Sequence, residues 1–303
     1  MPGATLLYFK GEEQSALSLA NLIGLDAQLI KRHDFPDGEF KLQLPSSLAA
    51  KTIIFHTLDH PNEKLIELLL VARTARQMGA SSLTLIAPYL AYMRQDIAFA
   101  PGEVVSQRIV GDLLASLFDD VITVDPHLHR VSALEQAVPV KRAIVLSAAP
   151  ILGDLAAKRR VNPILIGPDS ESAQWVAQAA LPHQLEYAVA QKIRHGDRAV
   201  EITLPAINVT GRPVVLVDDI ASSGATLARA AELLLSKGAK SVDVAVTHAL
   251  FSDGALDLIK RAGVDHVWST DCVIHPSNAV SVAPLIAQAW NTLNSSGRMN
   301  QPE

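Results

Sequence analysis

The hydrophobic pattern of the chain alternates between short, continuously apolar runs and longer stretches with helical spacing. Short runs that are apolar on both faces are typical of strands in a parallel sheet covered on both sides. They predict strands over Thr52–His56, Ser82–Ala87, Val121–Val124, Ile164–Ile166, Val214–Val217 and Val242–Thr247. The longer stretches predict helices over Glu63–Met78, Ser106–Leu117, Ser172–Ala180 and Leu227–Ser236. This alternation predicts an α/β protein with mainly parallel sheets flanked by helices.

Two segments of the chain resemble each other. LLLVARTARQMGASSLTLIAPYL (residues 68–90) and LARAAELLLSKGAKSVDVAVTHAL (residues 227–250) each combine a helical pattern, a Gly-Ala pair and a strand pattern. Their glycines, Gly79 and Gly238, are about half a chain length apart. The spacing predicts two similar α/β domains that meet near Ile144–Ala149, although any two helix–strand units share some likeness.

Composition narrows the class of protein. The 303 residues suffice for about two domains, and the 49% of hydrophobic residues allow a large core. With 26 basic and 31 acidic residues the net charge is −5, which argues against a nucleic-acid binder that relies on a basic surface. The single cysteine, Cys272, favours a reducing compartment. Because the sequence shows neither a signal peptide nor a membrane span, we expect a cytoplasmic protein.

The stretch VVLVDDIASSGAT places two adjacent acids, Asp218 and Asp219, at the end of an expected buried strand. Ligands of open parallel sheets bind beyond the carboxyl ends of the strands. Five small residues then lead into a helix: Ser222, Ser223, Gly224, Ala225 and Thr226. Small residues and a helix N-terminus let backbone N–H groups approach a phosphate. A phosphorylated sugar suits both features, with its phosphate in the turn and its diol on the acids. A plain strand end with one capping aspartate explains only one of the acids.

The segment His33-Asp-Phe-Pro-Asp-Gly-Glu39 contains Pro and Gly, which predict a turn. The turn presents Phe35, Asp37 and Glu39 outward. An aromatic ring beside two carboxylates suits a purine, which stacks on the ring and donates its amino hydrogens to the acids. A solvated hairpin turn is the alternative.

Two further polar segments follow expected strands in the first half of the chain. After Ala87 the chain reaches Arg94, Gln95 and Asp96, where the arginine suits a phosphate and the other two suit a nucleotide or the water of a metal. His127 follows the strand that ends in Thr123-Val-Asp-Pro and suits Mg²⁺ or phosphate. A surface loop with a salt bridge and a structural histidine are the alternatives.

The second half of the chain has two such segments. Asp169 follows the strand Ile164–Ile166 and suits a divalent ion, although it can also cap the next helix. Lys192 and Arg194 are two residues apart, so on a strand they face the same side. Beside the polar segment His195–Leu204 they suit a loop that closes over a transferred phosphoryl group. A charged hairpin is the alternative.

Together and in this order, the motifs FPDGE, RQD, TVDPH, GPD, KIR and VVLVDDIASSGAT resemble the ribose-phosphate pyrophosphokinase (PRPP synthetase) family. The resemblance implies two phosphoribosyltransferase-like domains, an ATP-binding domain over residues 1–146 and a ribose 5-phosphate-binding domain over residues 147–303. It implies Mg²⁺-dependent transfer of the diphosphoryl group of ATP to the 1-hydroxyl of ribose 5-phosphate, giving phosphoribosyl pyrophosphate (PRPP) and AMP. It also implies a homo-oligomer in which a neighbouring subunit completes the ATP site.

The resemblance assigns a role to each motif. It implies ATP contacts at Phe35, Asp37, Glu39, Arg94, Gln95, Asp96 and His127. It implies metal ligands at His127 and Asp169, and ribose 5-phosphate contacts at Asp218, Asp219 and Ser222–Thr226. Lys192 and Arg194 become the catalytic residues. A regulatory homologue without activity, and a phosphoribosyltransferase that consumes PRPP, remain the alternative functions.

Overall fold

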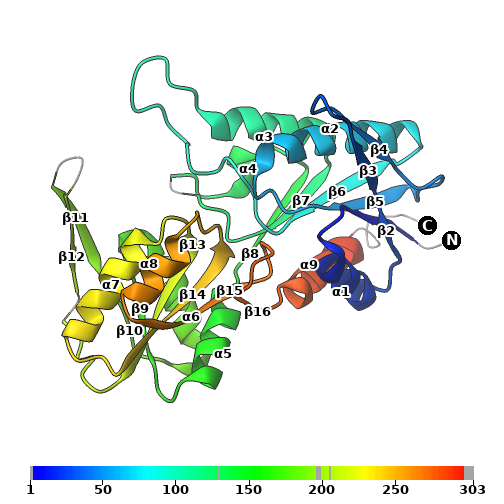
Figure 1. Ribbon diagram of the computed structural model, residues 1–303. Coiled ribbons are helices and arrows are strands. Elements are labelled where there is room, and N and C mark those ends of the chain that lie inside the picture. Colours follow the sequence, from blue (N-terminus) through cyan, green and yellow to red (C-terminus); the bar gives the residue numbers. More distant parts are fainter. Residues whose placement is uncertain (1–2, 129, 196–198, 205, 297–303) are drawn as a thin grey trace. The chain divides into compact units, whose positions relative to one another are not determined.

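The computed structural model describes residues 3–128, 130–195, 199–204 and 206–296, and it describes only the backbone of 192–195, 199–202 and 295–296. The chain forms two compact units (Figure 1). Unit 1 comprises Met1–Leu146 and Val282–Glu303, and unit 2 comprises Ser147–Ser281. None of the described helices is both long enough and apolar enough to cross a membrane.

Unit 1 contains a six-stranded parallel sheet in the order β2-β1-β5-β6-β7-β8. A separate antiparallel hairpin, β3–β4, follows β2. The strands are β1 Thr5–Tyr8, β2 Ala27–Leu29, β3 Lys31–Asp34, β4 Phe40–Gln43, β5 Lys51–Phe55, β6 Ser82–Ala87, β7 Asp120–Val124 and β8 Arg142–Leu146. The helices are α1 Glu13–Ile23, α2 Pro61–Gln77, α3 Ser106–Leu117, α4 Leu134–Ala137 and α9 Ala283–Ser296.

Unit 2 repeats this arrangement with the parallel order β10-β9-β13-β14-β15-β16 and a separate antiparallel hairpin, β11–β12. The strands are β9 Ile164–Gly167, β10 Tyr187–Val189, β11 Gln191–His195, β12 Ala199–Thr203, β13 Pro213–Ala221, β14 Ser241–Ala249, β15 Val264–Thr270 and β16 Asn278–Val280. The α-helices are α5 Ala149–Arg159, α6 Ala173–Ala180, α7 Ala225–Ser236 and α8 Ala255–Arg261. Two 3₁₀ turns are Ser170–Ser172 and Leu181–His183.

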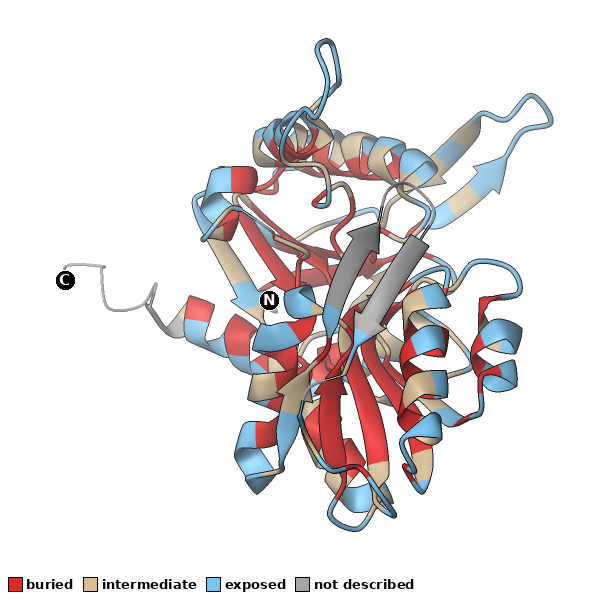
Figure 2. Ribbon diagram, turned by 90° about the vertical axis from the view of Figure 1, so that its left-hand side faces the viewer, coloured by how far each residue is buried: buried red, intermediate tan, exposed pale blue. Residues whose placement is uncertain are grey.

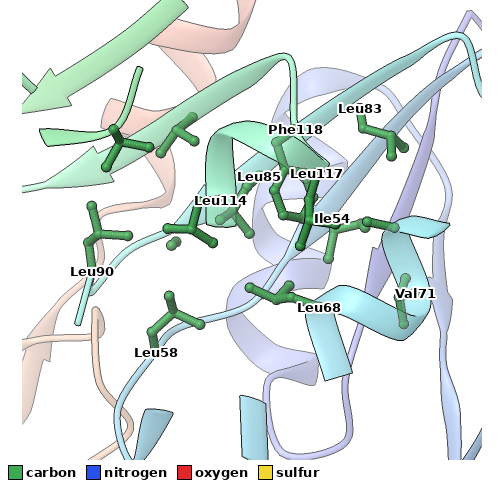
Figure 3. Close-up of a cluster of buried hydrophobic side chains, with 14 of the residues drawn as sticks. Ile54, Leu58, Leu68, Val71, Leu83, Leu85, Leu90, Leu114, Leu117 and Phe118 are labelled. Atoms are coloured by element: carbon green, nitrogen blue, oxygen red, sulfur yellow. The ribbon is translucent and has the colours of Figure 1, made fainter. Parts of the chain in front are cut away.

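Each sheet is buried on both faces, which explains why its strands are apolar throughout. In β13, Val214 and Leu216 pack with α7 and α8, while Val215 and Val217 pack with α5 and α6. Figure 2 shows buried strands between helices whose outer faces are exposed. In unit 1, side chains of β5 and β6 meet those of α2 and α3 in one apolar cluster (Figure 3).

The predicted elements agree closely with this fold. The strand predicted over Ser82–Ala87 and the helix predicted over Ser106–Leu117 have the bounds of β6 and α3. The predicted strand Val214–Val217 extends to Ala221, because β13 continues its pairing with β14 beyond the two acids. Gly79 and Gly238 both adopt positive φ angles, of 99° and 86°, after α2 and α7. The predicted repeat therefore corresponds to equivalent parts of the two units.

The last helix does not follow the expected domain boundary between residues 146 and 147. It groups with unit 1, where α9 packs on α1, and not with the rest of residues 147–303. Arg142 of β8 donates to the carbonyl oxygen of Leu293 at 3.3 Å, and Trp290 is buried. In unit 2, α5 packs on α6 in the same way. The helix that covers this part of unit 1 therefore comes from the far end of the chain.

Because α5 packs closely on α6, a single methyl group added between the two helices should lower the stability of the fold. A Cβ atom on Gly153 would lie 1.8 Å from the carbonyl oxygen of Ala179. Gly153→Ala must push the helices apart, and we expect a loss of roughly 1–3 kcal/mol of unfolding free energy. The control Lys158→Ala on the exposed side of α5 should stay within about 0.5 kcal/mol. Urea denaturation measures both, and equal midpoints for the two variants would contradict this packing.

Candidate functional site

The carboxyl end of β13 carries two acids at the centre of the unit 2 sheet. Because β13 lies between β9 and β14, Asp169, which follows β9, is near the pair Asp218 and Asp219. Asp219 is 2% exposed, and its backbone N–H donates to Asp218 Oδ1 at 3.0 Å. The Asp219 carboxylate accepts from the N–H of Ile220 at 2.8 Å. The strand ends therefore gather the three predicted acids at one edge of the sheet.

The electrostatics of this edge favour a cationic or hydrogen-bond-donating ligand. Burial raises the pKa of Asp218 well above its ordinary value, and repulsion by Asp219 and Asp169 raises it further. A carboxylate in this position gains from a proton, a divalent cation or donating hydroxyl groups. Oxygen ligands of this kind suit Mg²⁺. The acids are therefore chemically suited to a magnesium ion or to a sugar diol.

The turn after β13 contains a glycine that lies close to α8. Gly224 has a φ of 73°, and a Cβ there would lie 2.9 Å from Ile259 Cδ1. The helix α7 begins at the next residue, Ala225, so its first backbone N–H groups lie at the end of this turn. Ser222 and Ser223 are exposed. The predicted cradle, Ser222–Thr226, therefore lies between the acids and the N-terminus of α7, and its contact with a phosphate stays a prediction.

The predicted catalytic pair lies on β11. Lys192 pairs with Ile202 and Arg194 with Val200 in the hairpin β11–β12, so the backbone is in the expected strand. Their side chains lie outside the described part of the chain. The hairpin starts beside the acids, because Ala190 donates to the carbonyl oxygen of Gly167 at 2.8 Å, two residues before Asp169.

The predicted purine turn joins β3 to β4 and is exposed. Phe35 donates its N–H to the carbonyl oxygen of Glu39 at 2.8 Å, and Gly38, with a φ of 90°, donates to that of Phe35 at 3.1 Å. Asp37 Oδ1 accepts from the N–H of Glu39 at 3.2 Å. The Phe35 side chain is 40% exposed, with its ring edge toward His33. The turn is ordered, and its aromatic ring is accessible.

The segments after β6 and β7 are tied together by an ion pair that the sequence analysis missed. Asp96 Oδ1 lies 2.7 Å from Arg130 Nη1, and its other oxygen accepts from the Arg130 N–H at 3.2 Å. Arg94 is exposed and Gln95 is half-buried. The backbone carbonyl oxygen of Gln95 accepts from the N–H of Gln107. His127 is half-buried in the loop that Arg130 holds. The Asp96 carboxylate thus holds the loop that carries His127, and its predicted contact with ATP stays a prediction.

Unit 1 also contains a buried ion cluster that the sequence analysis did not identify. His56 Nδ1 lies 3.1 Å from Glu12 Oε2, and its Nε2 lies 2.9 Å from Glu67 Oε2. Glu67 also pairs with Arg32 at 2.6 Å. These residues line a cavity of about 750 Å³. Burial opposes the charge of His56, but its hydrogen bonds to Glu12 and Glu67 outweigh burial and raise its pKa. The feature of the sequence that could have indicated this cluster is His56, a polar residue directly after the apolar strand β5.

A group of side chains whose spacing suits a metal ion lies elsewhere in unit 2. Among the residues that the structure describes, the potential ligand groups that lie within 4.8 Å of one another are those of Asp243, Asp265 and His266. However, Arg160 binds the Asp243 carboxylate with two nitrogens at 2.6 and 2.7 Å. An arginine therefore already neutralises this cluster. Asp169, Asp218 and Asp219 do not form such a tight group within the described chain.

Two acids of unit 2, the half-buried Asp218 and the buried Asp243, predict opposite effects of the same substitution. The raised pKa of Asp218 means that its stabilising protonated form is present at low pH and is lost as pH rises through the folded-state pKa. At pH 7 without ligands, Asp218→Asn should therefore stabilise the fold by about 1 kcal/mol. Asp243→Asn removes the partner of Arg160 and should cost about 2 kcal/mol. Thermal unfolding measures both, and destabilisation by Asp218→Asn would refute the repulsion.

Comparisons with known proteins agree with the expected resemblance. Residues 5–117 match the N-terminal domain of ribose phosphate pyrophosphokinase, and residues 132–284 match the phosphoribosyl transferase domain. The chain is 36% identical to a ribose-phosphate pyrophosphokinase of Methanopyrus kandleri over 276 residues, covering 89% of this chain and 93% of that protein. It is 32% identical to that of Thermococcus kodakarensis over 255 residues, covering 84% and 89%.

A solved structure confirms the predicted fold class. The crystal structure of phosphoribosylpyrophosphate synthetase from Mycobacterium smegmatis matches with a TM-score of 0.82 at 23% identity, covering 97% of this chain and 99% of that one. The two sheets with their flanking helices are the two predicted phosphoribosyltransferase-like domains. With both family models and the close relatives covering most of its length, the chain belongs to the ribose-phosphate pyrophosphokinase family.

Proposed function

We propose that the protein transfers the β,γ-diphosphoryl group of ATP to the 1-hydroxyl of ribose 5-phosphate, giving PRPP and AMP. The observation that carries the proposal is the carboxyl end of β13, where the acidic pair directly precedes a turn of small residues and a helix N-terminus. The names of the relatives support the same reaction. The single cysteine, Cys272, supports a cytoplasmic location.

Ribose 5-phosphate binds at this turn in the proposal. The hydroxyl groups of the sugar donate to Asp218 and Asp219, which relieves their mutual repulsion. The phosphate lies on Ser222–Thr226, where the backbone N–H groups and the positive end of α7 stabilise its charge.

ATP binds to unit 1 in the proposal. The purine contacts are Phe35, Asp37 and Glu39. The contacts to the phosphates and their metal are Arg94, Gln95, Asp96 and His127, and the pairing of Asp96 with Arg130 brings the last two segments together. The exposed tip of the hairpin β3–β4 supports purine contacts to a neighbouring subunit, and hence a homo-oligomer.

Magnesium is the proposed metal, with His127 as a ligand of one ion beside the ATP phosphates and Asp169 as a ligand of a second ion near the ribose. When bound, it supplies positive charge that lowers the repulsion between the polyphosphate and the incoming hydroxyl group. The carboxylates near Asp218 fit such an ion, because each gains from a neighbouring cation.

The reaction needs positioning and charge stabilisation more than covalent chemistry. The 1-hydroxyl oxygen of the ribose attacks the β-phosphorus and loses its proton, and the bond from the β-phosphorus to the AMP oxygen breaks. Lys192 and Arg194 stabilise the negative charge that develops on the β-phosphoryl oxygens and on the leaving AMP. Their place on a hairpin next to β9 supports this role.

Phosphorus NMR tests the proposed reaction directly. Protein with ATP, ribose 5-phosphate and Mg²⁺ should give AMP and a sugar-linked diphosphate without ADP, and a metal chelator should stop the reaction. ADP with ribose bisphosphate would contradict diphosphoryl transfer. Absence of any product with intact nucleotide binding would favour a regulatory homologue.

The catalytic role of β11 is tested by Lys192→Ala. Loss of one preorganised donor costs about 10²–10³-fold in kcat in comparable sites, so we expect at least about 10²-fold lower turnover with an unchanged fold. Lys260→Ala, at an exposed lysine in the last turn of α8, should keep wild-type turnover. Steady-state kinetics with circular dichroism measure both, and equal turnover for Lys192→Ala would remove the lysine from the mechanism.

A further inference from the structure

The strand registers of the two units can be superimposed residue by residue. Tyr8 pairs with the last residue of β2, and Gly167 pairs with the last residue of β10. The next residues, Ile30 and Ala190, each donate their N–H to the carbonyl oxygen of Tyr8 or Gly167 at 2.8 Å. Equivalent hairpins then begin with β3 and β11. The two units therefore share one frame up to these hairpins.

This frame makes Arg32 of unit 1 the counterpart of Lys192 in unit 2, since each is the second residue of the first hairpin strand. Likewise, the pairing of β1 with β5 and of β9 with β13 makes His56 the counterpart of Asp218. The position of a substrate-binding acid in unit 2 thus holds a base in unit 1. The acidic pair Asp218 and Asp219 of unit 2 is therefore replaced by His56 and Thr57 in unit 1.

The charges in the pocket of unit 1 satisfy one another. His56 is held between Glu12 and Glu67, and the Glu12 carboxylate also accepts from the N–H of Thr57 at 2.8 Å. The side chains of His56, Glu12 and Glu67 are 3%, 6% and 5% exposed. Buried ionic groups are stable only when they are paired in this way. The pocket therefore forms a rigid internal anchor.

Arg32 connects this anchor to the hairpin β3–β4. It pairs with Glu67 at 2.6 Å and Glu63 at 2.9 Å on α2, and with Asp34 on its own strand at 2.6 Å. Its guanidinium lies 4.3 Å from the ring centroid of Phe40 on β4. The hairpin is outside the six-stranded sheet, so contacts of this kind must fix it. One side chain thus joins both hairpin strands to α2.

We propose that Arg32 is a positioning residue for ATP, because it locks the hairpin whose turn presents Phe35, Asp37 and Glu39 to the purine. This inference rests on the proposed function of that turn. Where unit 2 uses the second hairpin position for catalysis, unit 1 uses it to immobilise a binding turn. A planar guanidinium can serve three carboxylates and an aromatic ring together, whereas a lysine cannot.

The test compares Arg32→Lys with a control, Arg76→Lys. Arg76 lies near the C-terminal end of α2, the helix that carries Glu63 and Glu67, and pairs with Asp119 at 2.6 Å. Arg32→Lys should raise the KM for ATP about tenfold, with KM for ribose 5-phosphate and kcat within about twofold. Backbone amide exchange at Phe35–Glu39 should become faster, and that of β6 should not change. Glu63→Gln, at an exposed carboxylate, should change the same quantities less strongly.

Binding of ATP alone, measured by titration calorimetry, separates this inference from the proposed function. A weaker affinity in Arg32→Lys but not in Arg76→Lys supports positioning. An unchanged affinity and unchanged amide exchange in Arg32→Lys would overturn it, whether or not the wild type turns over. A wild type that binds ATP and forms no PRPP would overturn only the proposed function.

Discussion

Parallel sheets bring the carboxyl ends of their strands to one edge, and the chemistry of both units depends on this constraint. In unit 2 it gathers Asp169, Asp218 and Asp219, which lie far apart in the sequence. In unit 1 it gathers the segments that carry His56, Asp96 and Arg130 at the same edge. Because helices cover both faces of each sheet, the strands are apolar along their length, and the polar side chains lie where the strands end.

The equivalent positions His56 and Asp218 of the two units have opposite electrostatic surroundings. Unit 2 places the Asp218 carboxylate beside the carboxylates of Asp219 and Asp169, and burial together with their repulsion raises its pKa. Unit 1 pairs His56 with the buried acids Glu12 and Glu67, and Glu67 also pairs with Arg32. Equivalent positions of a repeated fold can thus carry an acid in a proposed substrate site and a histidine in a charge-paired cluster.

Helix packing explains why unit 1 combines segments from both ends of the chain. The sheet of unit 1 needs a helix beside α1, and α9 supplies it from the far end of the chain. In unit 2, α5 lies beside α6, and Gly153 allows their backbones to approach. Such a contact leaves no local mark in the sequence, because an apolar helix can pack on either unit.

The sequence by itself determined the α/β class, the duplication and the position of Asp218, Asp219 and the following small residues, because these depend on local hydrophobic period and on strand ends. Only the tertiary structure decided that Asp96 binds Arg130, that Glu12 and Glu67 enclose His56, and that α9 joins unit 1. Glu12 and His56 are 44 residues apart in the sequence. Partners at such separations are set by strand order and helix packing, and neither is written in a local pattern.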